Sequence, residues 1–277
     1  MEFGHELSVG SLFKLTSFLA WSWLYVWCAV QYPDQSPEWN SRVITLLHGS
    51  VAAVAGMAQC GFRSLTPHFL TMKMMPHHYA LMVWSWGYFA FDLLWCVVYW
   101  SESALMLCHH TTALVAITIY MQKDYKGCTF ACTLALLEVT NPLLQIRWFL
   151  KNERQDKTLL YLIVEVTYLV MFLTVRGVIG TYLMFKILKS DFFDVDEKIL
   201  CIVFYAVSLG FIYNILGYVM YKYKAQIVSG REFLYVYVYI IYTHACIAND
   251  ICKGTDLLPL FTNYVLFFIL QNILCLV

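Results

Sequence analysis

The stretch MLCHHTTALV, residues 106–115, places two adjacent histidines in the middle of an apolar run. An imidazole there loses much of its water, so the surroundings must supply polar partners for it. The whole chain has the same apolar character, because 61% of its 277 residues are hydrophobic, 17% are aromatic and only 13% are charged. This composition lies far outside the range of soluble globular domains and predicts an integral membrane protein.

Apolar runs set the number of expected membrane spans. A helix that crosses the hydrocarbon core needs roughly 20 apolar residues. Runs of this kind begin near Leu12, Val43, Tyr79, Ala104, Gly127, Thr158 and Ile199. Two further runs, 233–248 and 257–277, are also apolar, and the first is short enough for an interfacial or buried helix. The sequence therefore predicts an all-α, multi-pass transmembrane helical bundle with seven spans and one or two further helices near its end.

Charge and cysteine content narrow the function class. Lys and Arg together number 18, as do Asp and Glu, and no basic run is present, so we expect no nucleic-acid partner. Most cysteines fall within the expected spans or at their edges, which predicts buried thiols rather than disulfides; these are Cys28, Cys60, Cys96, Cys108, Cys132 and Cys201. Cys128 and Cys132 share a helix face, but no second pair accompanies them, so we expect no metal site.

Lysine and arginine are nearly balanced between the two sides of a seven-span bundle. The loops that hold Arg42, residues 151–157 and residues 221–226 fall on one side, and this side is slightly the richer. The positive-inside rule favours this side as cytosolic, with the N-terminus on the lumenal or outer side.

Seven ionisable side chains lie within the expected spans, where each costs about 2.5–3.5 kcal/mol at the centre of a helix on insertion scales. They are distributed over five successive spans, from the second to the sixth: His48, Asp92, His109, His110, Glu138, Glu165 and Arg176. This distribution predicts a shared polar interior within the bundle. The alternative is purely structural, with histidines bonding between helices and salt bridges that only hold the bundle together.

Helix geometry relates some of these residues to one another. Glu138, Asn141 and Gln145 are spaced i, i+3 and i+7, which places them on one stripe, and Pro142 predicts a kink within it. Glu165 and Arg176 are separated by roughly 16 Å along one helix and cannot pair. We therefore expect Arg176 to pair with a carboxylate on a neighbouring helix, either Glu138 or Asp92.

The histidines of the opening stretch diverge around their own helix. His109 and His110 are about 100° apart, so they cannot both point straight at one cavity, although a crowded bundle can accommodate both on one broad face. One of them is expected to act through the other or to support it.

Three stretches resemble the TLC domain, which is shared by ceramide synthases, the translocon-associated TRAM proteins and a set of TLC domain-containing proteins. They are FDLLWCVVYW at 91–100, ALMLCHHTTALV at 104–115 and LALLEVTNPLLQIRWFLK at 134–151, and RVITLLHG at 42–49 is similar to the start of that domain. The resemblance implies an N-terminal segment with one helix at 1–39, a TLC domain at 40–225 and an apolar C-terminal tail at 226–277. It also implies six helices arranged as a barrel around a lipid-accessible cavity, preceded by one helix.

The same resemblance implies a chemistry that this chain matches only in part. In ceramide synthases a His-His pair and a downstream His-Asp-x-Ser-Asp segment carry acyl transfer, and His109 and His110 match the pair. The downstream segment departs from the motif: Leu137, Glu138, Thr140 and Asn141 stand where the family has His, the first Asp, Ser and the second Asp. Losing a carboxylate and a histidine removes much of the proton-transfer machinery, which disfavours ceramide synthesis.

These observations lead to one leading hypothesis and two alternatives. The leading hypothesis is an endomembrane protein, expected in the endoplasmic reticulum, that binds, senses or transfers a lipid or acyl chain in lipid homeostasis and needs no cofactor. The alternatives are a His-dependent acyltransferase that takes acyl-CoA as substrate, and a cargo or translocon adaptor. The candidate catalytic residues are His109, His110 and Glu138, and the residues expected to line the lipid cavity are His48, Asp92, Asn141, Gln145, Glu165 and Arg176.

Overall fold

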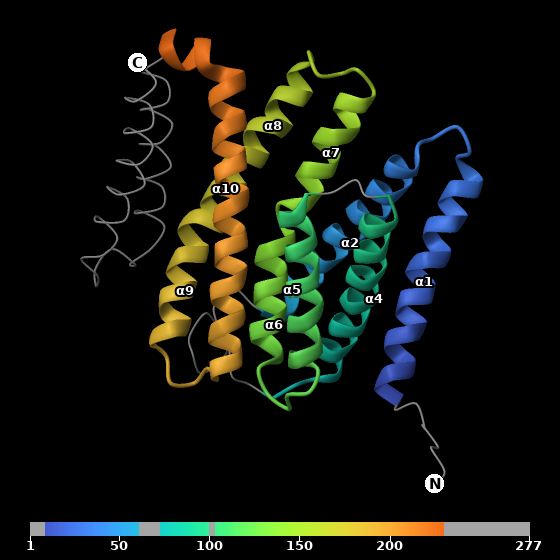
Figure 1. Ribbon diagram of the computed structural model, residues 1–277, viewed down its shortest axis with the longest axis vertical. Helices are drawn as coiled ribbons and strands as arrows, with labels where there is room; N and C mark the ends of the chain where they lie inside the picture. Colours follow the sequence, from blue (N-terminus) through green and yellow to red (C-terminus); the bar gives the residue numbers. More distant parts are fainter. Residues whose placement is uncertain (1–8, 61–72, 100–102, 230–277) are drawn as a thin grey trace. The chain divides into compact units, whose positions relative to one another are not determined.

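The computed structural model describes residues 9–60, 73–99 and 103–229 of the chain. Within these ranges the chain is helical, apart from connecting turns and one isolated bridge between Lys73 and Tyr125. In chain order the elements are α1 (Val9–Gln31), α2 (Pro37–Cys60), α4 (Pro76–Tyr99), α5 (Ala104–Tyr120), α6 (Gly127–Glu138), α7 (Asn141–Asn152), α8 (Leu159–Phe172), the π-helical η1 (Leu173–Ile179), α9 (Gly180–Lys189) and α10 (Val195–Ser229) (Figure 1). The predicted all-α, multi-pass bundle is confirmed.

Among the described residues, helix length and composition identify five helical stretches that are long and apolar enough to cross a membrane. They are Pro37–Cys60, Pro76–Tyr99, Gly127–Asn152, Leu159–Lys189 and Val195–Lys224. Each of the seven expected runs coincides with a helix, but α1 is not among the five, and α5 is shorter, at 17 residues. The exact number of helices in the barrel therefore stays a prediction, and the runs at 233–248 and 257–277 lie outside the described residues.

The chain divides into two compact units, Met1–Leu216 and Gly217–Val277. In the first unit, α2 packs mainly against α6, and α1 packs against α4 (Figure 1). The most deeply buried hydrophobic side chains of this unit come from α2, α4 and α6, and include Ile44, Ala52, Met82, Tyr88 and Ala131. The core thus lies where these three helices meet, next to the polar residues predicted from the sequence.

Small residues allow α2 and α6 to approach each other closely. A Cβ atom added at Gly56 would lie 2.7 Å from the carbonyl oxygen of Ala131 and 3.0 Å from the Cβ of Ala135. Because lipid tails are as apolar as leucine, helices in membranes associate largely through such close packing. Gly56 is therefore a residue on which the α2–α6 contact depends.

The predicted kink at Pro142 takes the form of a break between α6 and α7. α6 ends at Glu138, α7 begins at Asn141, and Pro142 lies in the first turn of α7, where its missing N–H breaks no helical hydrogen bond. The break keeps the polar stripe of this segment inside the bundle while the chain changes direction.

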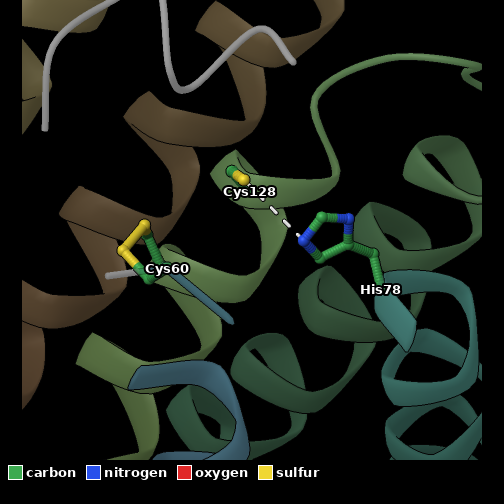
Figure 2. The surroundings of a disulfide bond; sticks show 4 residues. Cys60, His78 and Cys128 are labelled. Carbon is green, nitrogen blue, oxygen red and sulfur yellow. Dashed lines mark hydrogen bonds between the residues drawn. A yellow bond between two sulfur atoms is a disulfide. The ribbon is translucent and has the colours of Figure 1, made fainter. Parts of the chain in front are cut away.

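A disulfide joins Cys60, the last residue of α2, to Cys132 in α6, with the two Cα atoms 5.0 Å apart (Figure 2). For these two residues the expectation of buried thiols was wrong. The two cysteines are 72 residues apart in sequence, and only the packing of α2 on α6 brings them together. Cys28, Cys96 and Cys128 are buried, and Cys108 is exposed. The Sγ atom of Cys128 lies 3.7 Å from Nε2 of His78 (Figure 2).

The disulfide predicts the orientation of the bundle. Disulfides persist in oxidising compartments, so we expect the end of the bundle that holds Cys60 and the α5–α6 loop to face the lumen or the cell exterior. The distribution of lysine and arginine favours the same orientation. In sealed vesicles of known orientation, Asp124→Cys should react with a membrane-impermeant maleimide only from the lumenal or exterior side, and Asp156→Cys only from the cytosolic side. Labelling of both variants from one side, or in the reverse pattern, would refute this orientation.

The close contact at Gly56 predicts a substitution that runs against ordinary helix propensity. In a helix interior, Gly→Ala normally stabilises by roughly 0.5–1 kcal/mol. At Gly56 we expect the opposite, a loss on the order of 1–3 kcal/mol from overpacking, since the added methyl meets the α6 backbone. Gly217→Ala is the matched control, because a Cβ there has no neighbour within 4 Å. Thermal unfolding in detergent should show a lower midpoint for Gly56→Ala alone; equal midpoints would contradict the close packing.

Candidate functional site

Asp92 and His110 form the best-defined polar pair in the interior. Asp92 comes from α4 and His110 from α5, and Nε2 of His110 lies 3.2 Å from Oδ2 of Asp92. Both residues are less than a tenth exposed. The hydroxyl of Tyr88, one turn before Asp92 on α4, lies 3.3 Å from the same carboxylate oxygen and 3.1 Å from Oγ1 of Thr45. The carboxylate therefore contacts one imidazole and one phenol.

His48 and Glu138 form a second pair, from α2 and α6. Nδ1 of His48 lies 3.9 Å from Oε2 of Glu138, which is an electrostatic contact rather than a hydrogen bond. The imidazole of His48 stacks on the ring of Tyr88, with centroids 3.8 Å apart and planes at 6°, and its Nε2 lies 3.3 Å from Oγ of Ser85. Tyr88 thus touches His48 with its face and Asp92 with its hydroxyl, and so joins the two pairs.

The predicted stripe on α6 and α7 extends these pairs toward the end of the bundle. Nδ2 of Asn141 donates to Oε2 of Glu138 at 2.9 Å, and Nε2 of Gln145 donates to Oδ1 of Asn141 at 2.9 Å. Nη1 of Arg42 then donates to Oε1 of Gln145 at 3.1 Å. We call the connected set the polar network; its members are Arg42, His48, Tyr88, Asp92, His110, Glu138, Asn141 and Gln145.

His109 lies outside the polar network. Its ring stands edge-on to two phenylalanines of α10, with centroids 6.2 Å from Phe204 and 5.8 Å from Phe211. Its Nδ1 has no hydrogen-bond partner in the described part of the chain. Because adjacent residues of a helix diverge by about 100°, one histidine faces α4 and the other faces α10.

Glu165 forms its own ion pair between α7 and α8. Nε of Arg147 donates to Oε1 of Glu165 at 2.9 Å, and the hydroxyl of Tyr161 donates to the same oxygen at 3.0 Å. The Glu165 side chain is fully buried. Arg147 was not among the residues singled out from the sequence. The signal that could have found it is the need of a buried glutamate for a cation, which Arg147 supplies across the connection between α7 and α8.

Arg176, in η1, has neutral oxygens as its partners. Its Nη2 donates to the backbone carbonyl of Leu137 at 2.7 Å, and its Nη1 reaches Oγ of Ser208 at 3.5 Å. The expected salt bridge to Glu138 or Asp92 is not formed, and that expectation was wrong. The physical reason is geometric: η1 brings the guanidinium to the α6 backbone, whereas the Glu138 carboxylate turns toward Asn141.

A cavity of about 150 Å³ lies on the other side of α6. It is bounded by α5, α6, the η1–α9 segment and the first part of α10, and most of its walls are apolar, including Phe89, Leu137, Met184 and Phe204. Polar groups on its walls include Arg176, Ser208 and Glu197.

The cavity separates the predicted lipid-contacting residues into two groups. Arg176 lines it, whereas five residues of the same prediction do not: His48, Asp92, Asn141, Gln145 and Glu165. The candidate catalytic residues, His109, His110 and Glu138, do not line it either. Phe89 connects the cavity to the polar network. Its ring borders the cavity, and the ring centroid lies 5.9 Å from that of His110 and 5.4 Å from that of His48. The roles predicted for these residues stay predictions.

Among the described residues, Asp92, Cys96 and His110 form a fully buried group that could hold a metal ion. Each offers one ligand atom, and the three atoms lie within 4.8 Å of one another. Carboxylate, thiolate and imidazole are all ligands that zinc accepts. The contact between Asp92 and His110 accounts for the closeness of those two without an ion, so the geometry by itself does not demand one.

A cluster of charged residues closes the end of the bundle next to the cavity. Nζ of Lys123 lies 2.9 Å from carboxylate oxygens of both Asp194 and Asp196, and Nζ of Lys126 lies 2.5 Å from Oε2 of Glu197 and 3.2 Å from Oδ2 of Asp194. We call these five residues the loop ion cluster. It joins the α5–α6 loop to the start of α10, where Glu197 lines the cavity.

Comparison with known proteins places these features in a family context. The TLC domain matches residues 38–223, which is more than half of the chain. The chain is also similar to TLC domain-containing protein 4 A of Dictyostelium discoideum, with 22% identity over 183 residues that cover 64% of this chain and 70% of that protein. Both α6 and α7, and the whole polar network, fall inside the matched range.

The loop ion cluster predicts a loss of stability in acid. Hydrogen bonds from Lys123 and then Lys126 lower the pKa of Asp194 below its ordinary value. A carboxyl with a depressed folded-state pKa stabilises the fold above its unfolded pKa, near 4, and this stabilisation is lost as the pH falls through the folded pKa.

We expect the effect to be small, because the side chain of Asp194 is 65% exposed. Thermal midpoints measured from pH 7 to pH 3 should fall less steeply for Asp194→Asn than for the wild type. Asp156→Asn, in the loop at the other end of the bundle, is the control. Parallel curves for all three proteins would contradict the assignment.

Proposed function

Since the chain belongs to the TLC domain family, we propose that it acts in membrane lipid homeostasis and that its helical bundle binds, senses or transfers a lipid or an acyl chain. The cavity between α5, α6, α9 and α10 is the observation that carries this proposal. Its apolar walls suit a hydrocarbon chain, and ligand sites of helical bundles form between helices in this way. An endoplasmic reticulum or related endomembrane location is part of the proposal.

The polar network supports a role beyond passive packing. Leu137 lines the cavity, and the next residue, Glu138, belongs to the network, so one turn of α6 contacts both. A ligand that moves this turn also moves the Glu138 carboxylate relative to His48. The arrangement suits a protein that senses whether its cavity is filled.

His-dependent acyl transfer, with acyl-CoA as the substrate, is the second candidate function. It is favoured by the 3.2 Å contact between Nε2 of His110 and Oδ2 of Asp92, since a carboxylate-oriented imidazole can serve as nucleophile or general base. The ring of Phe89 borders the cavity and lies next to His110, and for this reason we rank acyl transfer below lipid binding. An acyl carbonyl in the cavity could reach His110 only if the Phe89 ring moved aside.

Within the family, we propose a functional kinship with TLC domain-containing protein 5. The proposal rests on residues 138–150, EVTNPLLQIRWFL, and on the resemblance to that member that we infer from this stretch. This stretch contains the hydrogen-bonded ladder of Glu138, Asn141 and Gln145. A shared function would therefore involve this ladder.

Lipid profiles of cells that express matched amounts of wild type, His110→Ala and Glu138→Gln test the proposal. We expect both variants to change the phospholipid or sphingolipid profile relative to wild type, because each removes a member of the polar network. His77→Ala and Glu153→Gln are matched controls on exposed residues and should leave the profile unchanged.

Two outcomes would replace lipid binding with another function. If neither variant alters lipids while the cellular effect of the protein persists, the lipid-binding and acyl-transfer proposals are both refuted and an adaptor role is favoured. If purified wild type turns over acyl-CoA and His110→Ala does not, acyl transfer replaces binding as the function.

A further inference from the structure

Arg176 is a buried cation that the protein leaves without a carboxylate. The residue is only 9% exposed, and guanidinium groups keep their charge in proteins. A charge in a membrane interior is normally paired, because its desolvation is otherwise uncompensated. Its hydrogen-bond partners are instead a backbone carbonyl and a serine hydroxyl, its guanidinium lies 5.4 Å from the centroid of the Phe172 ring, and its Nε has no hydrogen-bond partner among the described residues.

The acidic residues nearest to Arg176 are engaged elsewhere. Glu138 follows Leu137 on α6, but its Oε2 accepts a hydrogen bond from Asn141 and faces His48. Glu197 borders the same cavity, but Lys126 holds its Oε2 at 2.5 Å and Lys123 lies 3.7 Å from its Oε1. Arg176 thus forms no salt bridge with a carboxylate in the described part of the chain, and Glu138 acts on its guanidinium only from a distance.

The backbone around Arg176 is unusual. The residue lies at the centre of η1, a seven-residue π-helical segment between α8 and α9. π-helical turns are rare, and they occur frequently at functional sites. This backbone feature is independent of the missing carboxylate partner, and both observations point to Arg176 as a functional residue.

The cavity defines what can reach the guanidinium. Its volume of about 150 Å³ is similar to that of an engineered apolar protein cavity that binds benzene, so it has room for one small polar head and a few carbons. The walls near the guanidinium are apolar, among them Leu137, Val175 and Phe204. The free donors of Arg176 and these walls together fit an anionic oxygen group joined to an apolar chain.

We propose that Arg176 binds the anionic head, a carboxylate or a phosphate, of a single-chain lipid whose first carbons occupy this cavity. Guanidinium groups bind the oxygens of both anions with paired, charge-assisted hydrogen bonds. Arg176 lines the cavity, and Nη1 and Nη2 each carry one N–H group more than the hydrogen bond that they make within the bundle, so these two atoms can donate to such an anion. This inference rests on the proposed lipid-binding function and names the ligand class of its cavity. The ligand supplies the negative charge that the bundle lacks at this position.

Binding of three chain-matched ligands to the full-length protein tests the inference. Hexadecanoate, 1-hexadecanoyl lysophosphatidate and the uncharged hexadecanol are compared in nanodiscs of phosphatidylcholine, which carries no net charge. We expect wild type to bind at least one of the two anions roughly tenfold or more tighter than the alcohol, as charge-assisted hydrogen bonds imply. Which anion binds more tightly distinguishes a carboxylate ligand from a phosphate ligand.

Variants of Arg176 then test whether this residue causes the preference for the anionic ligands over the alcohol. Arg176→Gln should reduce the affinity for the anion to that for the alcohol, and Arg176→Lys should retain part of the preference, because it keeps the charge without the paired donors. Arg154→Gln, on an exposed arginine between α7 and α8, is the matched control and should bind like wild type.

The outcomes separate this inference from the proposed function. Equal affinity of wild type for all three ligands would overturn the role of Arg176 while leaving chain binding intact, and this comparison does not depend on any variant folding. An anion preference that survives in folded Arg176→Gln would also overturn it. If wild type binds none of the three, the lipid-binding function itself is refuted.

Discussion

The cost of placing a charge away from water is the constraint on which the rest of this structure depends. Three buried carboxylates each find a different solution: Asp92 contacts the imidazole of His110, Glu138 accepts from Asn141, and Glu165 pairs with Arg147. These contacts join consecutive helices: α4 to α5, α6 to α7, and α7 to α8. The polar residues that make the chain costly to insert therefore also specify how its helices pack, since each must face its partner rather than lipid.

Helix α6 separates the polar network from the cavity. Its polar face carries Glu138 toward α2 and the polar network, whereas its neighbour Leu137 borders the cavity and offers its carbonyl to Arg176. Leu137 and Glu138 are adjacent in one helical turn, so a movement of the cavity wall at Leu137 also moves Glu138 of the polar network. The same helix is held closely against α2 at Gly56 and by the disulfide of Cys132, so its position is well defined.

The end of the bundle next to the cavity is held by several kinds of contact. The disulfide joins α2 to α6, and the loop ion cluster joins the α5–α6 loop to the start of α10. Phe193 packs against Cys132 and also lines the cavity, so the covalent link and the cavity wall are in contact. Lys126 adopts a left-handed conformation, with φ of 74°, as the chain turns into α6, and its ammonium reaches Glu197. Rigid closure at this end would leave a ligand to enter elsewhere.

The sequence by itself determined the membrane class, the helical fold, the order of the apolar runs and the ladder of Glu138, Asn141 and Gln145. These features follow from composition and from helix periodicity, which acts over a few turns and is readable in one segment. Only the tertiary structure decided that His110 rather than His109 meets Asp92, that Arg147 pairs with Glu165, that Cys60 bonds to Cys132, and that Arg176 meets a backbone carbonyl instead of a carboxylate. Such partners lie on different helices, and their identity depends on the rotation and depth at which the helices pack, which no local spacing specifies.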